Sequence, residues 1–108
     1  MGLKGKPKLA YGDLVVDVFR ALDDETRRLV LDELAARDGR TLFEICSVLA
    51  MRHGLTLTRQ AISQHLAVLE AACLVVTERR GRTKLHYFDP GPLAEISRRW
   101  PPAEGTDP

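Results

Sequence analysis

The sequence has 108 residues, of which 44% are hydrophobic, and its net charge is only +1. A chain of this length can bury one small core, so we expect a single domain. The near-neutral charge neither favours nor excludes a polyanionic partner. No apolar run approaches the ~18 residues of a membrane span, and no apolar run follows the basic N-terminus. We therefore predict a cytoplasmic protein with no membrane partner.

The charges are distributed unevenly along the chain. Residues 1–10 carry three lysines and no acid, whereas residues 11–50 carry nine acids against five arginines. Residues 75–86 are basic, with Glu78 as the one acid among Arg79, Arg80, Arg82 and Lys84. We interpret residues 1–12 as a flexible basic tail, 13–100 as the folded domain and 101–108 as a disordered end.

Three helices are predicted in the first half of the domain. Apolar residues recur at helical spacing from Asp13 onward. Asp24 is the expected N-cap of a second helix that ends near Arg37. Thr41 and Glu44 form a capping-box pattern, which places the start of a third helix at Leu42.

The stretch 58–72 is predicted as a fourth helix with two unlike faces, capped by Thr58. Ile62, Leu66 and Leu69 form an apolar stripe, and short polar side chains occupy the opposite side. The helix ends near Cys73, at a place where glycine is the usual residue because the chain turns left-handed.

The sequence period then changes from 3.6 to 2. Residues 74–79 and 83–88 are rich in β-branched and aromatic residues and flank Arg80-Gly81-Arg82, which predicts a hairpin with a basic tip. A last helix follows, with Pro92 in its first turn and ending before Pro101. The predicted fold is mainly α with a small β-hairpin: a winged helix-turn-helix of four helices, two strands and a fifth helix.

A helix-turn-helix followed by a basic hairpin indicates binding to double-stranded DNA. The fourth helix can enter the major groove, and the hairpin, or wing, can reach the backbone or minor groove. The predicted contacts of the recognition helix are Thr58, Arg59, Gln60, Ser63, Gln64 and His65; those of the wing are Arg79, Arg80, Arg82 and Lys84. Gln60, Ser63 and Gln64 are the candidates for base recognition. His65 lies beside the apolar stripe, so packing or a phosphate contact is the favoured role for it.

The outer helices carry more apolar surface than one small core needs. A two-fold dimer would bury the excess and would space two recognition helices by roughly one DNA turn, which predicts an inverted-repeat operator. The predicted interface residues are Leu14, Val15, Val18, Phe19, Leu22, Leu93, Ile96 and Trp100.

Metal binding and catalysis receive little support. Cys46, Cys73 and the three histidines lack the spacing of metal ligands, and no nucleophile elbow or phosphate-binding loop is present. We predict a protein that is not an enzyme and needs no cofactor or metal. Two alternatives stay open: a winged helix that binds another protein, and a repressor that senses metal or redox state through Cys46 or Cys73.

The chain resembles the ArsR/SmtB family of bacterial winged-helix repressors. The resemblance spans about residues 13–100 and rests on 18–28, on 59–75 with its Ser-x-His-Leu-x-Val-Leu core, and on Arg79-Arg80-Gly81-Arg82. It implies a homodimer joined by the first and last helices, DNA binding by the fourth helix and wing, and repression relieved by a signal. The metal sensors of this family carry Cys-x-Cys on the third helix, where this chain has Cys46-Ser47-Val48. The resemblance therefore points to a non-metal branch with an unknown inducer.

Overall fold

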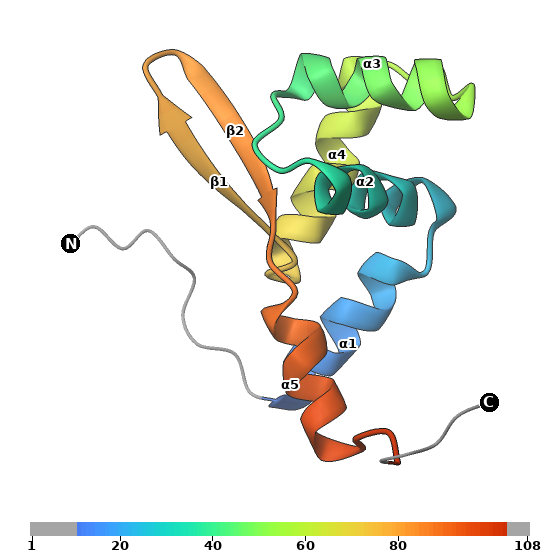
Figure 1. The fold of residues 1–108 in the computed structure, drawn as a ribbon, viewed down its shortest axis with the longest axis vertical. Helices are drawn as coiled ribbons and strands as arrows, with labels where there is room; N and C mark the ends of the chain where they lie inside the picture. Colours follow the sequence, from blue (N-terminus) through green and yellow to red (C-terminus); the bar gives the residue numbers. More distant parts are fainter. Residues whose placement is uncertain (1–10, 104–108) are drawn as a thin grey trace.

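A computed structural model describes residues 11–103 of the chain. Four helices come first, a two-stranded antiparallel hairpin follows, and a fifth helix ends the domain (Figure 1). This order confirms the predicted fold class. The elements are α1 (Tyr11–Leu22), α2 (Glu25–Ala36), α3 (Leu42–His53), α4 (Arg59–Ala71), β1 (Val75–Arg80), β2 (Thr83–Phe88) and α5 (Gly91–Arg99). The predicted end segments are 1–12 and 101–108, of which positions 1–10 and 104–108 lie outside the described residues. Tyr11 and Gly12, assigned to the tail, belong to α1.

The predicted caps are present at the starts of the three central helices. The Asp24 carboxylate accepts from the backbone N–H of Arg27 at 3.1 Å. Thr41 and Glu44 form the reciprocal capping box, with distances of 3.1 and 2.9 Å. Thr58 accepts from the backbone N–H of Ala61 at 3.0 Å. Each cap satisfies a backbone donor that the helix itself cannot pair, which explains why the helices begin where they do.

The core lies where α2, α3 and α4 meet. Its largest fully buried side chains include Leu34 from α2, Ile45 and Leu49 from α3, and Ile62 and Leu69 from α4. A helix-turn-helix of α3 and α4, joined by residues 54–58, packs against α2 through these residues. The face of α4 opposite to Ile62 and Leu69 is left in solvent.

The hairpin is joined to the helices at its base. His86 of β2 is 4% exposed, and its backbone pairs with Arg40 in the loop before α3. Its ring Nδ1 also lies 2.9 Å from the Arg40 carbonyl oxygen. The distal end turns at Gly81, whose φ is 61°, a conformation that favours glycine in a tight hairpin. The hairpin is thus fixed at its root and extends away from the core at its tip (Figure 1).

Helix α4 ends near Cys73, as predicted, and the chain there makes a left-handed turn with cysteine in place of glycine. Cys73 has a φ of 62°. Its N–H donates to the Glu70 carbonyl at 2.9 Å, and the N–H of Leu74 donates to the Leu69 carbonyl at 3.0 Å. These two bonds are those of a Schellman motif, so the turn has the usual geometry without the usual residue.

Helix α1 is apolar on two faces. One face, with Val18 at 0% exposure, packs into the core of the same chain. Val18 therefore cannot present surface to a partner, and its assignment to the predicted interface is corrected. The other face carries Val16 and Phe19, which are 54% and 59% exposed. Leu14, Leu22, Leu93 and Ile96 are partly buried against the core, and Val15 is partly buried as well.

Candidate nucleic-acid interface

The outer face of α4 presents the predicted base-recognition residues to solvent. Gln60, Ser63 and Gln64 are all exposed, as are Thr58 and Arg59 at the start of the helix. No acid occupies the first turn, so the positive end of the helix dipole is free to attract an anion. The helix therefore combines a cationic N-terminus with amide and hydroxyl groups along one face.

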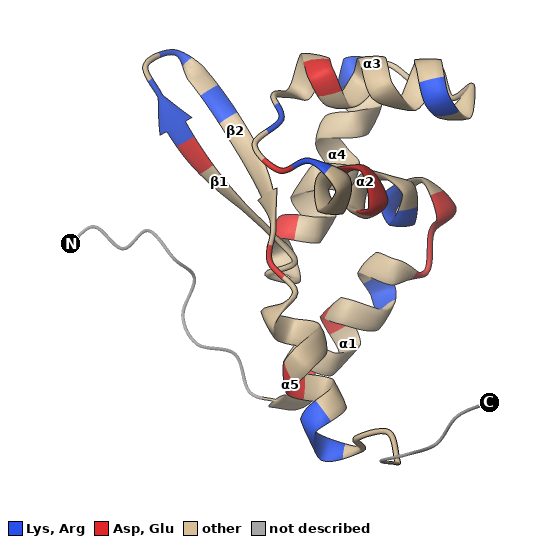
Figure 2. Cartoon of the chain, viewed as in Figure 1, with Lys and Arg blue, Asp and Glu red and all other residues tan. Residues whose placement is uncertain are grey.

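The wing concentrates positive charge at its end (Figure 2). Arg79, Arg82 and Lys84 are exposed near the tip. Arg80 differs, because its Nε lies 3.4 Å from Glu78 on the same strand. The Glu78 carboxylate also accepts from the Tyr87 hydroxyl at 2.9 Å, and this hydrogen bond raises the pKa of Tyr87. Glu78 thus partly neutralises Arg80 and leaves the other cations to give the wing its charge.

The recognition helix and the wing border one groove of about 570 Å³. Arg59 and Ser63 line it from α4, and Arg82 and Lys84 line it from the wing. Glu70 is the one acid among its lining residues. Residues of the two predicted contact sets, which lie about twenty positions apart in the sequence, therefore face a common cationic space. Such a groove suits a phosphate backbone.

His65 does not line this groove. It is half-buried, and its Nδ1 lies 3.2 Å from Nη1 of Arg27 on α2. Arg27 also interacts with Asp24. Burial raises the pKa of Asp24, but the hydrogen bond from the Arg27 backbone N–H and the Arg27 charge outweigh that effect and lower the pKa overall. The intermediate burial is consistent with a packing role for His65, and its contact with DNA stays a prediction.

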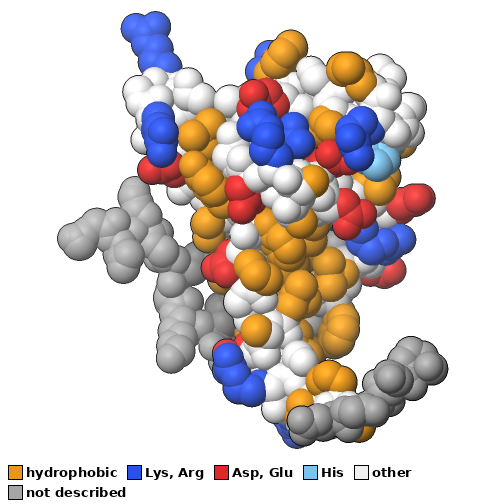
Figure 3. All heavy atoms as spheres, in the orientation of Figure 1, with side chains coloured by type: hydrophobic (Ala, Val, Ile, Leu, Met, Phe, Trp, Pro, Cys, Tyr) orange, Lys and Arg blue, Asp and Glu red, His pale blue; other side chains and the backbone are white. Residues whose placement is uncertain are grey.

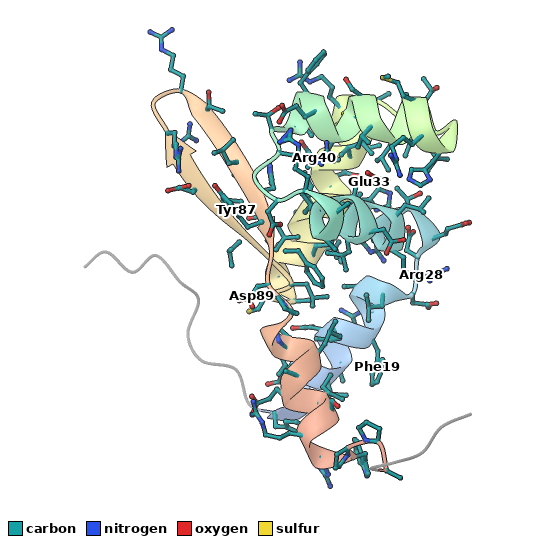
Figure 4. All side chains as sticks on the ribbon, viewed as in Figure 1. Phe19, Arg28, Glu33, Arg40, Tyr87 and Asp89 are labelled. Atoms are coloured by element: carbon teal, nitrogen blue, oxygen red, sulfur yellow. The ribbon has the colours of Figure 1, made fainter. Side chains whose placement is uncertain are left out.

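A buried carboxylate supports the helix-turn-helix from behind, and the sequence did not reveal it. Glu33 of α2 is 4% exposed, and it lies 2.8 Å from His53, 3.2 Å from Arg52 and 3.7 Å from Arg40. Figure 4 shows Glu33 and Arg40 close to one another between α2, α3 and β2. The hydrogen bond with His53 is the main cause of the lowered pKa of Glu33. This cluster ties the end of α3 and the root of the wing to α2.

The cysteines show no paired arrangement. Cys46 and Cys73 are free thiols of intermediate burial. Within residues 11–103, no three His, Cys, Asp or Glu side chains lie together as metal ligands would.

The helices of this part of the chain are too short or too polar to cross a membrane.

Comparisons with known proteins agree with this geometry. The profile of a helix-turn-helix domain family matches residues 22–78. The chain is 45% identical over 83 residues to YuzN, an HTH-type transcriptional regulator of Bacillus subtilis, and the match covers 77% of this chain and 90% of that protein. The structure of an ArsR-like regulator from Rhodococcus superposes with a TM-score of 0.63 at 37% identity, over 82% of this chain and 76% of the other. The chain belongs to the ArsR/SmtB family.

This ArsR/SmtB protein is a DNA-binding transcriptional regulator, as predicted from the recognition helix and wing. A further structure shares the fold at 22% identity, with a TM-score of 0.66 over 90% of this chain and 85% of the other: the homodimeric winged helix-turn-helix domain Mb0332 from Mycobacterium bovis.

Proposed function

We propose that this regulator acts in the cytoplasm as a homodimeric repressor that binds an inverted-repeat operator. The observation that carries the proposal is the common groove between α4 and the wing, with cations on both of its walls. In this arrangement α4 enters the major groove, and the wing follows the adjacent backbone. Repression follows when the bound dimer covers sequence that the transcription machinery needs.

Base recognition is assigned to Gln60, Ser63 and Gln64, because their side chains are exposed and can hydrogen-bond to base edges. Arg59 and Thr58 lie at the helix N-terminus, where phosphate binding is favoured. Arg79, Arg80, Arg82 and Lys84 of the wing supply affinity that depends on salt, with Arg80 contributing least because Glu78 competes for its charge.

Dimerisation is supported by apolar surface on α1 and at the end of α5. Phe19 points away from the helical body in Figure 4 and, like Val16 and Trp100, is largely exposed. Figure 3 shows hydrophobic side chains gathered over the part of the molecule formed by α1 and α5. An exposed patch of this kind is typical of an interface, and the Mycobacterium bovis domain of similar fold is a homodimer.

Two alanine substitutions separate the two proposed DNA contacts. Gln64→Ala is expected to reduce binding to a genomic site recovered by selection by about 1–3 kcal/mol and to leave binding to random duplex unchanged. Arg82→Ala is expected to weaken binding to both duplexes and to lower the slope of log affinity against log salt by about 1, because one phosphate is no longer neutralised. If Gln64→Ala weakened both duplexes equally, base recognition by Gln64 would be wrong.

A further inference from the structure

Arg27 of α2 makes hydrogen bonds to both α1 and α4. Only 14% of its side chain is exposed. Its Nε donates to the carbonyl oxygen of Ala21 at 2.8 Å, and its Nη2 donates to that of Arg20 at 3.1 Å. These carbonyls belong to the last turn of α1, which has no partners for them within the helix. Arg27 therefore fixes the end of α1 against the start of α2.

The remaining nitrogen of Arg27 reaches the recognition helix. Nη1 lies 3.2 Å from His65 Nδ1. A guanidinium has donors and no acceptor, so Nδ1 must accept and must carry no proton. In neutral His65, the contact therefore favours the tautomer that carries its proton on Nε2.

The Nε2 atom of His65 is not fully buried. Among residues 11–103 it makes no hydrogen bond. In this part of the chain, Tyr11 Oη is the one buried side-chain nitrogen or oxygen that lacks a hydrogen-bond partner, so the unpaired Nε2 of His65 keeps some exposed surface. At about 100° per residue, His65 and Ser63 lie on opposite flanks of Gln64. Ser63 faces the groove shared with the wing, so His65 lies on the flank of α4 away from the wing.

We propose that Arg27 is a positioning residue, which holds His65 so that its Nε2–H donates to a DNA phosphate across the major groove from the wing. This inference rests on the proposed binding of duplex DNA by α4. A helix in the major groove lies between two phosphate backbones. The charged side chains of the wing contact one phosphate backbone, and the neutral Nε2–H of His65 contacts the other. A neutral donor makes a hydrogen bond without adding to counterion release.

The tautomer is tested without DNA by long-range ¹H–¹⁵N NMR spectra of the three histidines at alkaline pH, where imidazole is neutral. His65→Gln identifies the His65 signals. The wild-type chain is expected to show the Nε2–H form, and Arg27→Gln a mixture of both tautomers. Arg28→Gln is the matched control, because Arg28 donates to the Leu22 carbonyl at 2.7 Å and so caps the same helix. An Nδ1–H form in the wild-type chain would overturn the inference. This outcome does not depend on the folding of any variant.

The phosphate contact is tested by the affinity for a random-sequence duplex over a range of salt concentrations. His65→Ala is expected to weaken binding roughly tenfold with an unchanged salt slope, and His65→Gln to restore much of the affinity because its amide can also donate. Arg82→Ala should instead lower the slope. An unchanged affinity or a lowered slope for His65→Ala contradicts the neutral contact. A wild-type chain that retained no duplex would refute the proposed function itself.

Discussion

Replacing Cys73 with glycine is expected to stabilise the protein. Cys73 ends α4 with a φ of 62°, and a residue with a Cβ in this left-handed region costs about 1–2 kcal/mol. Glycine removes this strain. It also makes the unfolded chain more flexible, which offsets about 0.4–1 kcal/mol of the gain in stability. The expected result is that Cys73→Gly is about 0.5–1 kcal/mol more stable than Cys73→Ala, which lacks the thiol but retains the Cβ.

Thermal unfolding at a fixed protein concentration measures this difference. For a domain of this size, the glycine variant should unfold about 2–8 °C above the alanine variant. Ala67→Gly is the control, because Ala67 is exposed within α4 and glycine in a helix interior should lower stability by about 1 kcal/mol. If Cys73→Gly proved less stable than Cys73→Ala, the strain attributed to this turn would be absent.

Two further substitutions probe the interface and the buried carboxylate. Phe19→Asp is expected to sediment as a monomer. Phe43 of α3 is at least as exposed as Phe19, and Phe43→Asp should remain dimeric. A dimeric Phe19→Asp would show that the interface lies elsewhere. Glu33→Gln is expected to lose about 1.5–3 kcal/mol at neutral pH, because it weakens hydrogen bonds between charged groups. Since the pKa of Glu33 lies below its ordinary value of 4.5, this stabilisation is present above that pH and disappears as the pH falls through the folded-state pKa. Urea titrations at about pH 7 and about pH 3 check this, and an equal deficit at both values would rule out an ionised Glu33 as the cause.

The helix starts were predictable because capping is local. Asp24, Thr41 and Thr58 each bond to a backbone N–H three residues ahead, so the pattern lies within one turn of sequence. The wing was predictable for a similar reason, because its two strands are adjacent and its turn contains Gly81. Of the groove, the sequence predicts that α4 and the wing are neighbours, because the hairpin directly follows α4 in the chain.

The contacts that position these elements were not predictable from local patterns. Glu33 and His53 lie 20 positions apart, and Arg27 and His65 lie 38 apart. Only the packing of helices brings them together. Val18 was assigned to the interface for a related reason: α1 is apolar around most of its circumference, and helical periodicity alone does not tell which of two apolar faces meets the chain's own core.

Specific recognition of DNA by α4 and the wing is tested most directly by selection of genomic DNA fragments with the purified wild-type protein at moderate salt. We predict that the retained fragments share an inverted repeat, with half-sites centred about 10 bp or one helical turn apart. We also predict that Gln64→Ala no longer enriches that repeat. Failure of the wild-type protein to retain any fragment would contradict recognition of DNA by α4 and the wing.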